Sequence, residues 1–268
     1  MEYYKLSSKF IIPYLTSDFI LIFAIKYYIL KSNFTFRAKI RNITGGIMKK
    51  AFTLAEVLIT LGIIGVVAAL TIPNLISHYQ KEKTVTQLKK NFSLANQAIM
   101  LAVADHGDYL GWESVDEIGE NAYFDKYWKP YFKGITLCTN KNICQYEQRG
   151  GNLSSFYYLN GNESLITAVY GGRSTIMLPD GTILINFSSY STSKVSWFYI
   201  DINGTEKPNT YGKDVFIFEK NEKGLLEPRC NNYTKEQVNQ NCSKSGTGEC
   251  CAKKIMNDNW KITQNYPW

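Results

Sequence analysis

A predominantly apolar run of 21 residues constrains this chain of 268 residues more than any other feature. It extends from Phe52 to Ile72 and contains one ionisable residue, Glu56. At a rise of 1.5 Å per residue, a helix of this length spans about 30 Å, the thickness of the hydrocarbon core of a membrane. A carboxylate inside such a helix costs roughly 2.5 to 3.5 kcal/mol on insertion, so it calls for a partner. The run therefore predicts a single membrane-spanning helix with one functional acid.

The positive charge of the chain is concentrated before this run. Residues 1–51 carry nine Lys and Arg against two acidic residues, whereas residues 52–268 are balanced. Lys49 and Lys50 lie immediately before the apolar run, and basic flanks stay on the cytoplasmic side of a membrane. We therefore expect the N-terminus to be cytoplasmic and the rest of the chain to be exported. A balanced domain has no basic surface for a phosphate backbone, so no nucleic-acid partner is expected.

The start of the apolar run resembles the processing signal of type IV prepilins and type II secretion pseudopilins. Between Lys49 and Glu56, a basic leader and a small residue precede Phe, and Glu is the fifth residue counted from that Phe. The resemblance implies that a prepilin peptidase cuts between Ala51 and Phe52 and methylates the new amine. It also implies a bacterial inner-membrane anchor and a head that is periplasmic or part of a cell-surface filament. Ala51 departs from the family, which usually has Gly at this position.

The resemblance also implies a role for Glu56 in assembly. The new amine of Phe52 is cationic near pH 7, and Glu56 of an incoming copy can neutralise it inside the apolar filament core. Such a pair would also fix the axial register of one subunit against the next. Pro73 matches a pilin position at which proline kinks the helix at the membrane exit.

Residues 1–51 are expected to be a leader. Its own apolar stretch, residues 19–30, is too short to cross a bilayer. Translation from Met48 would give an ordinary short basic leader, with Gly45 and Gly46 then reflecting a ribosome-binding site in the gene. A genuine long leader is the alternative.

The helical pattern continues beyond the membrane half, over residues 74–107. Apolar residues recur at spacings of three and four, and lysines lie off their stripe. This pattern predicts an amphipathic half-helix that packs on the chain's own sheet and ends with Gly107 as its C-cap. The stripe consists of Leu75, Tyr79, Val85, Leu88, Phe92, Ala95, Ile99 and Ala102.

Strand patterns dominate the expected head, residues 108–268, after a loop region rich in aromatic residues. Asp180 and Gly181 form a natural hairpin turn. The predicted fold class is α+β: a long N-terminal helix, membrane-spanning over 52–73 and amphipathic over 74–107, packed on an antiparallel sheet of about four to six strands, as in pilins. The candidate strands are residues 156–159, 165–169, 174–178, 182–187, 195–201 and 214–218.

All six cysteines follow the apolar run, and an even number in an exported domain predicts disulfides. Zinc is the competing account, but the chain has no C-x-x-C pair, and its two histidines lie far from the cysteines in sequence. Cys138 and Cys144 are expected to close a local loop. Cys250 and Cys251 are adjacent and would be strained if joined to each other, so each is expected to pair with Cys230 or Cys242.

The segment from Asp201 to Asp214 concentrates oxygen-bearing side chains and turn formers. Calcium takes six to eight oxygen ligands from loops of this kind. The segment loosely resembles the calcium loop of major pseudopilins, which nominates Asp201, Asn203, Asn209 and Asp214. An Asx-turn loop without a metal is the alternative, and no other cofactor is expected.

Enzyme motifs are weak along the chain. Ser191 and Lys194 match S-x-x-K, but no S-D-N or K-T-G follows. We therefore expect no catalytic activity. The favoured function is a structural subunit of a type II secretion pseudopilus, with prepilin peptidase, copies of itself and other pilin-like subunits as partners. A type IV pilus subunit for adhesion, motility or DNA uptake and a membrane-tethered binding domain are the alternatives.

Overall fold

The computed structural model describes residues 53–138, 156–164, 175–188, 197–204 and 206–268, and it falls into two compact units, residues 1–66 and 67–268. The helices are α2 (Leu54–His106), η1 (Tyr109–Gly111), α3 (Val115–Ile118), α4 (Glu120–Tyr127), α5 (Lys235–Asn241) and α6 (Cys251–Asn257). The strands are β1 (Thr136–Leu137), β2 (Thr175–Met177), β3 (Ile183–Ile185), β4 (Trp197–Asp201), β5 (Val215–Lys220) and β6 (Leu226–Pro228).

The described part of the first unit, residues 53–66, is the beginning of α2. Its large apolar side chains are exposed, from Leu54 at 78% to Ile63 at 37%. The Thr60 hydroxyl donates to the Glu56 carbonyl at 2.9 Å, so this polar group is satisfied within the helix. By length and composition, α2 could cross a membrane, and none of its apolar window is buried.

The predicted long helix is confirmed. It runs for 53 residues, from Leu54 to His106, without interruption at Pro73. Gly107 ends it as expected, with φ at +81° and its N–H donating to the Val103 carbonyl at 2.9 Å.

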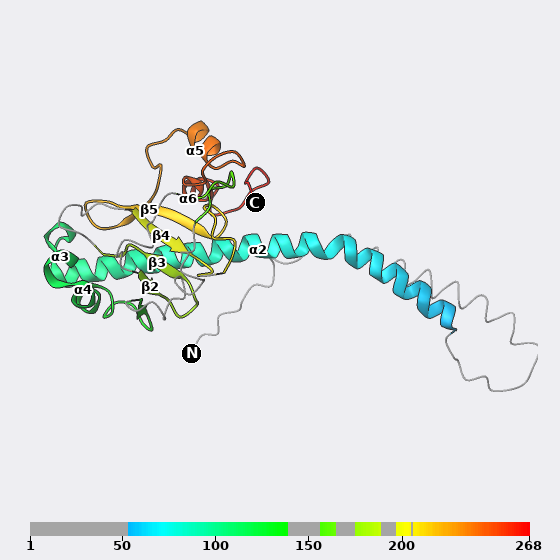
Figure 1. Ribbon diagram of the computed structural model, residues 1–268, viewed down its shortest axis with the longest axis horizontal. Helices are drawn as coiled ribbons and strands as arrows, with labels where there is room; N and C mark the ends of the chain where they lie inside the picture. Colours follow the sequence, from blue (N-terminus) through cyan, green and yellow to red (C-terminus); the bar gives the residue numbers. More distant parts are fainter. Residues whose placement is uncertain (1–52, 139–155, 165–174, 189–196, 205) are drawn as a thin grey trace, which may run out of the picture. The chain divides into compact units, whose positions relative to one another are not determined.

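The second unit is built on a six-stranded antiparallel sheet whose strands follow one another in sequence order, β1 to β6. Figure 1 labels the four central strands, β2 to β5. β4 and β5 form its longest pair, with Phe198 opposite Phe218. Side chains alternate between two cores: Phe198 and Ile200 belong to the core that contains α2, and Tyr199 belongs to a smaller core on the other face. The α+β prediction is therefore confirmed at the level of helix and sheet.

The inner face of α2 packs against this sheet. Leu88, Ala95 and Ala102 are fully buried in the main core, and the Phe92 ring stacks on Phe218 with centroids 5.1 Å apart. Asn96 bonds the edge strand β6 through its side chain, because its Oδ1 accepts from the Leu226 N–H at 2.7 Å. These contacts fix the helix on the sheet.

The predicted stripe is wrong at its N-terminal end. Leu75 and Tyr79 are 65% and 64% exposed, and the buried part of α2 begins at Thr84. The sheet is too short to cover the whole amphipathic half, so the first two members of the stripe have no cover within the described chain.

The strand predictions hold in the middle of the sheet and fail at its edges. β2, β3, β4 and β5 lie within or across the expected ranges, and the Asp180–Gly181 turn is confirmed, with Gly181 at φ +84°. Residues 156–159 form no strand; Tyr157 alone makes two isolated bridges, to Glu163 and Thr210, and residues 165–169 lie outside the described residues. The edge strands β1 and β6 were not predicted, because two or three residues carry too little alternation to stand out.

The aromatic region after α2 is not the loop that was expected. It contains η1, α3 and α4, and Trp112 stacks on Tyr127 with ring centroids 4.3 Å apart. A capping box begins α3: Ser114 N–H donates to the Glu117 carboxylate at 2.6 Å. The C-terminal tail is also helical, with α5 begun by a second box between Thr234 and Gln237.

The disulfide prediction for the tail is confirmed. Cys230 pairs with Cys250, and Cys242 pairs with Cys251, so the adjacent cysteines bond different partners. The two bridges hold α5 and α6 together and join them to the end of β6. Cys138 is disulfide-bonded, and its expected partner Cys144 lies outside the described residues.

One buried cation lies at the end of β5. Lys220 is 1% exposed, and its Nζ donates to the backbone carbonyls of Asn186 at 3.2 Å, Phe187 at 3.5 Å and Ser188. Removal from water lowers the pKa of Lys220 to about 7. In the unfolded chain a lysine titrates near 10.4. Between these values the unfolded chain binds a proton that the folded chain lacks, so the free energy of unfolding rises with pH.

Replacement of Lys220 by Met should remove this pH dependence. We expect the parent to gain about 2 kcal/mol of unfolding free energy relative to Lys220→Met between pH 7 and pH 9. The measurement is urea unfolding of the detergent-solubilised chain at three pH values. A difference between parent and variant that does not change with pH would contradict the buried-amine account.

Candidate functional site

The first turn of α2 holds Glu56 in a reciprocal capping box with Thr53. The Glu56 Oε2 atom accepts from the Thr53 N–H at 2.9 Å and from its hydroxyl at 3.0 Å. In return, the Glu56 N–H donates to the Thr53 hydroxyl at 3.2 Å. The carboxylate therefore satisfies the helix N-terminus of its own chain, where a negative charge is favoured by the helix dipole.

Thr53 is the residue that sequence reasoning missed at this site. The signal was present, because Thr53 and Glu56 have the T-x-x-E spacing of a capping box. The predicted cleavage residues, Ala51 and Phe52, precede the box directly and lie outside the described residues. The sequence thus places the expected new amine one residue before Thr53.

Pro73 lies within α2, 17 residues after Glu56. Proline has no N–H to donate to the carbonyl four residues earlier, so the ladder of helix hydrogen bonds lacks one member at this point. The Thr71 hydroxyl donates to the Val67 carbonyl at 2.9 Å in the same turn. The kink expected from the pilin resemblance stays a prediction.

The Asp201–Asp214 segment is organised around the Asp214 carboxylate. Its Oδ2 accepts from the Asn209 N–H at 2.7 Å and the Asn203 side chain at 3.2 Å, and its Oδ1 accepts from the Thr210 N–H at 2.6 Å. Asp201, fully buried, accepts from the Asn203 N–H at 3.3 Å. The structure therefore brings the four nominated residues into one turn.

The Oδ1 atoms of Asn203 and Asn209 are buried in this segment, and no described residue donates a hydrogen bond to them. Burial raises the pKa of the Asp214 carboxyl, and this effect exceeds the opposite effect of the hydrogen bonds that the carboxylate accepts from backbone N–H groups. Within the described ranges, no three His, Cys, Asp or Glu side chains gather as a metal site. A cation would therefore depend on amide oxygens as well as carboxylates, a donor set that suits calcium.

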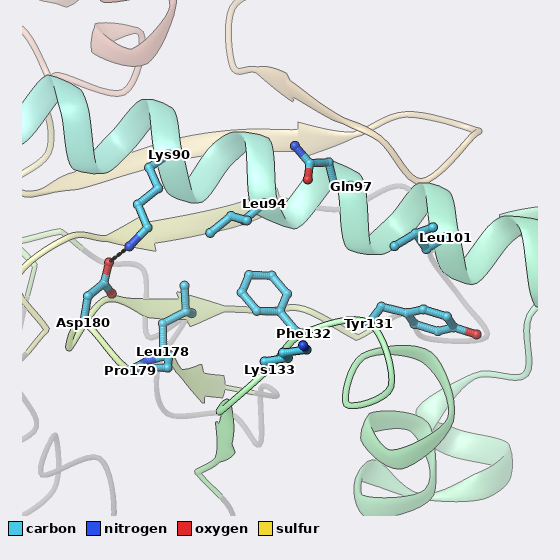
Figure 2. Close-up of a pocket in the computed structure, with 10 residues that line it drawn as sticks. All are labelled: Lys90, Leu94, Gln97, Leu101, Tyr131, Phe132, Lys133, Leu178, Pro179 and Asp180. Atoms are coloured by element: carbon cyan, nitrogen blue, oxygen red, sulfur yellow. Dashed lines mark hydrogen bonds and ion pairs between the residues drawn. The ribbon is translucent and has the colours of Figure 1, made fainter. Parts of the chain in front are cut away.

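A groove lies beside α2 (Figure 2). Its volume is about 600 Å³. Lys90 reaches across one end to Asp180, with Nζ and Oδ2 3.0 Å apart. We call it the Leu94 groove; it is lined by Lys90, Leu94, Gln97 and Leu101 of α2, by Tyr131, Phe132 and Lys133, and by Leu178, Pro179 and Asp180.

We call the segment from Asp201 to Asp214 the Asp214 turn, and calcium bound there should stabilise the parent chain. We expect a higher melting temperature with calcium, about 2.7 kcal/mol of stabilisation at a concentration 100 times the dissociation constant. Asp214→Asn keeps the shape of the side chain but loses its charge, so it should lose most of this response. Asp125→Asn, a surface acid paired with Lys129, is the control. Identical melting of the parent with and without calcium would remove the metal from the account.

Comparison with known proteins finds one family. Residues 74–268, which begin directly after Pro73, match a family of unknown function, DUF6613. No curated protein and no solved structure matches the chain. Because the matched region covers well over half of the sequence, the chain belongs to the family of unknown function DUF6613.

Proposed function

We propose that this protein is a structural subunit of a type II secretion pseudopilus. In this proposal α2 anchors the chain in the inner membrane, prepilin peptidase cuts before Phe52, and the mature subunit enters a filament with copies of itself and other pilin-like subunits. The observation that carries the proposal is the single carboxylate, Glu56, at the start of an apolar helical segment long enough to cross a membrane.

The capping box explains how a lone subunit can keep this acid in a membrane. With Thr53 as its partner, Glu56 has two donors within its own chain. Cleavage before Phe52 would add a cationic amine next to the box. In a growing filament, the amine of one copy and the carboxylate of the next would meet in a low dielectric, where an ion pair offsets the desolvation of both groups.

The Asp214 turn is the feature that favours secretion over a type IV pilus. Its buried, unpaired amide oxygens fit the calcium loop implied by the resemblance to major pseudopilins. A type IV pilus subunit would share the helix chemistry but has no separate support in the head. A tethered binding domain would use α2 as an anchor alone, and its Glu56 would then be only a helix cap.

Glu56→Gln separates the charge from the cap. Glutamine also completes a capping box, so the helix start should survive, but the counter-ion for the Phe52 amine is lost. We expect filament formation to fall at least tenfold while the amount of subunit in the membrane stays unchanged. The measurements are the yield of sheared filaments and crosslinking of cysteines placed along residues 52–72.

The matched control is Thr53→Val, which removes the capping hydroxyl and keeps the carboxylate. Assembly by this variant should stay close to that of the parent. Equal loss in both variants would mean that Glu56 acts only as a cap, and normal filaments in Glu56→Gln would overturn the proposal.

A further inference from the structure

The Leu94 groove combines an apolar floor with a charged rim. Phe132 and Leu178 are 7% and 3% exposed, so they belong to the fixed core rather than to a mobile surface. Figure 2 shows these two side chains below α2, with Leu94 above them. Leu101 is 54% exposed at the lining of the same groove. A rigid apolar floor of this kind fits a large side chain.

The rim has one cation, Lys133, without an ion-pair partner among the described residues. Lys90 is engaged by Asp180. Lys133 is exposed, and no carboxylate of the described residues lies within ion-pair distance of it. The groove therefore offers an apolar floor and a positive charge to an occupant.

A complementary surface lies earlier on α2, where the sheet does not reach. We call Leu75, Ile76 and Tyr79 the Tyr79 band; their exposed fractions are 65%, 49% and 64%. Glu82 follows three residues after Tyr79, so the two share one helix face. Its side chain is 71% exposed, and its partner is His78 at 3.9 Å. The band thus combines an apolar aromatic anchor with a negative charge that has only a weak partner.

We infer that the Leu94 groove of one copy receives the Tyr79 band of a second copy. The inference rests on the proposed function, because copies anchored in one membrane have parallel α2 helices. With Tyr79 of the second copy beside Leu94 of the first, its Glu82 comes within reach of Lys133. The offset of 15 residues corresponds to an axial displacement of about 22 Å.

This contact builds an open array. The groove and the band are different surfaces, so each copy binds one neighbour through its groove and another through its band. The ion pair between Glu82 and Lys133 would set the register, and the burial of Tyr79 would supply most of the affinity.

Cysteine crosslinking in the full-length chain tests the contact. Lys83 is exposed one turn after Tyr79, so a cysteine at this position leaves the Tyr79 band intact. Lys83→Cys and Gln97→Cys are combined in one chain, where the two positions lie about 21 Å apart and cannot bond each other. We expect a ladder of crosslinked multimers in membranes from the double variant and none from either single variant. A reference panel of cysteines across residues 52–72 reports filament formation independently.

The two readouts separate the two claims. The reference ladder comes from the cysteines across residues 52–72, and the groove ladder comes from the double variant. A reference ladder without a groove ladder would overturn the inference and leave the proposed function standing. Loss of both ladders would remove both. Crosslinked products that stop at dimers would also contradict the inference, because a two-fold contact would then replace the open array.

A charge swap tests the ion pair. Glu82→Lys or Lys133→Glu alone should weaken the groove ladder about fivefold, and the two changes together should restore it. Lys223→Glu, at an exposed turn away from the groove, is the matched control and should have no effect. Failure of the double swap to restore crosslinking would contradict the pairing.

Discussion

The packing of α2 against one face of the antiparallel sheet is the contact on which the head depends. Each strand is short, so the sheet needs a large apolar partner, and α2 supplies it through Leu88, Ala95, Ile99 and Ala102. Burial of one such leucine contributes roughly 1.5 to 3 kcal/mol. The same helix continues past the sheet toward its apolar N-terminal half, so its uncovered surface is a consequence of its length.

The outcome of the sequence predictions follows the length of each pattern. α2 was predictable because an apolar run of membrane-spanning length leads directly into apolar residues at spacings of three and four, and Gly107 supplies an evident cap. β2 to β5 were predictable from β-branched and aromatic runs around the Asp180–Gly181 turn. β1 and β6 were missed because they are too short to show a strand pattern, and they are strands only through their pairing with β2 and β5. The adjacency of Cys250 and Cys251 predicted that they bond different partners, whereas the choice between Cys230 and Cys242 for each of them came only with the structure.

The candidate sites divide in a similar way. Glu56 stood out from sequence because a lone acid in an apolar run is conspicuous, but its partner Thr53 required the capping-box spacing to be read as well. The Asp214 turn was found from its composition, whereas the unpaired amide oxygens within it depend on burial. Lys220 could not be anticipated, since only the fold places its amine against three carbonyls. The exposure of Leu75 and Tyr79 depends on where the sheet ends.

The central proposal is that cleavage before Phe52 creates an amine that pairs with Glu56 of another copy in a filament. It is tested most directly at the N-terminus of the mature protein. Mass spectrometry of the N-terminal peptide from cells that carry prepilin peptidase should find Phe52 as the first residue, with a methyl group on its amine. A peptide that crosses the intact Ala51–Phe52 bond in all of the membrane-inserted protein would contradict the account.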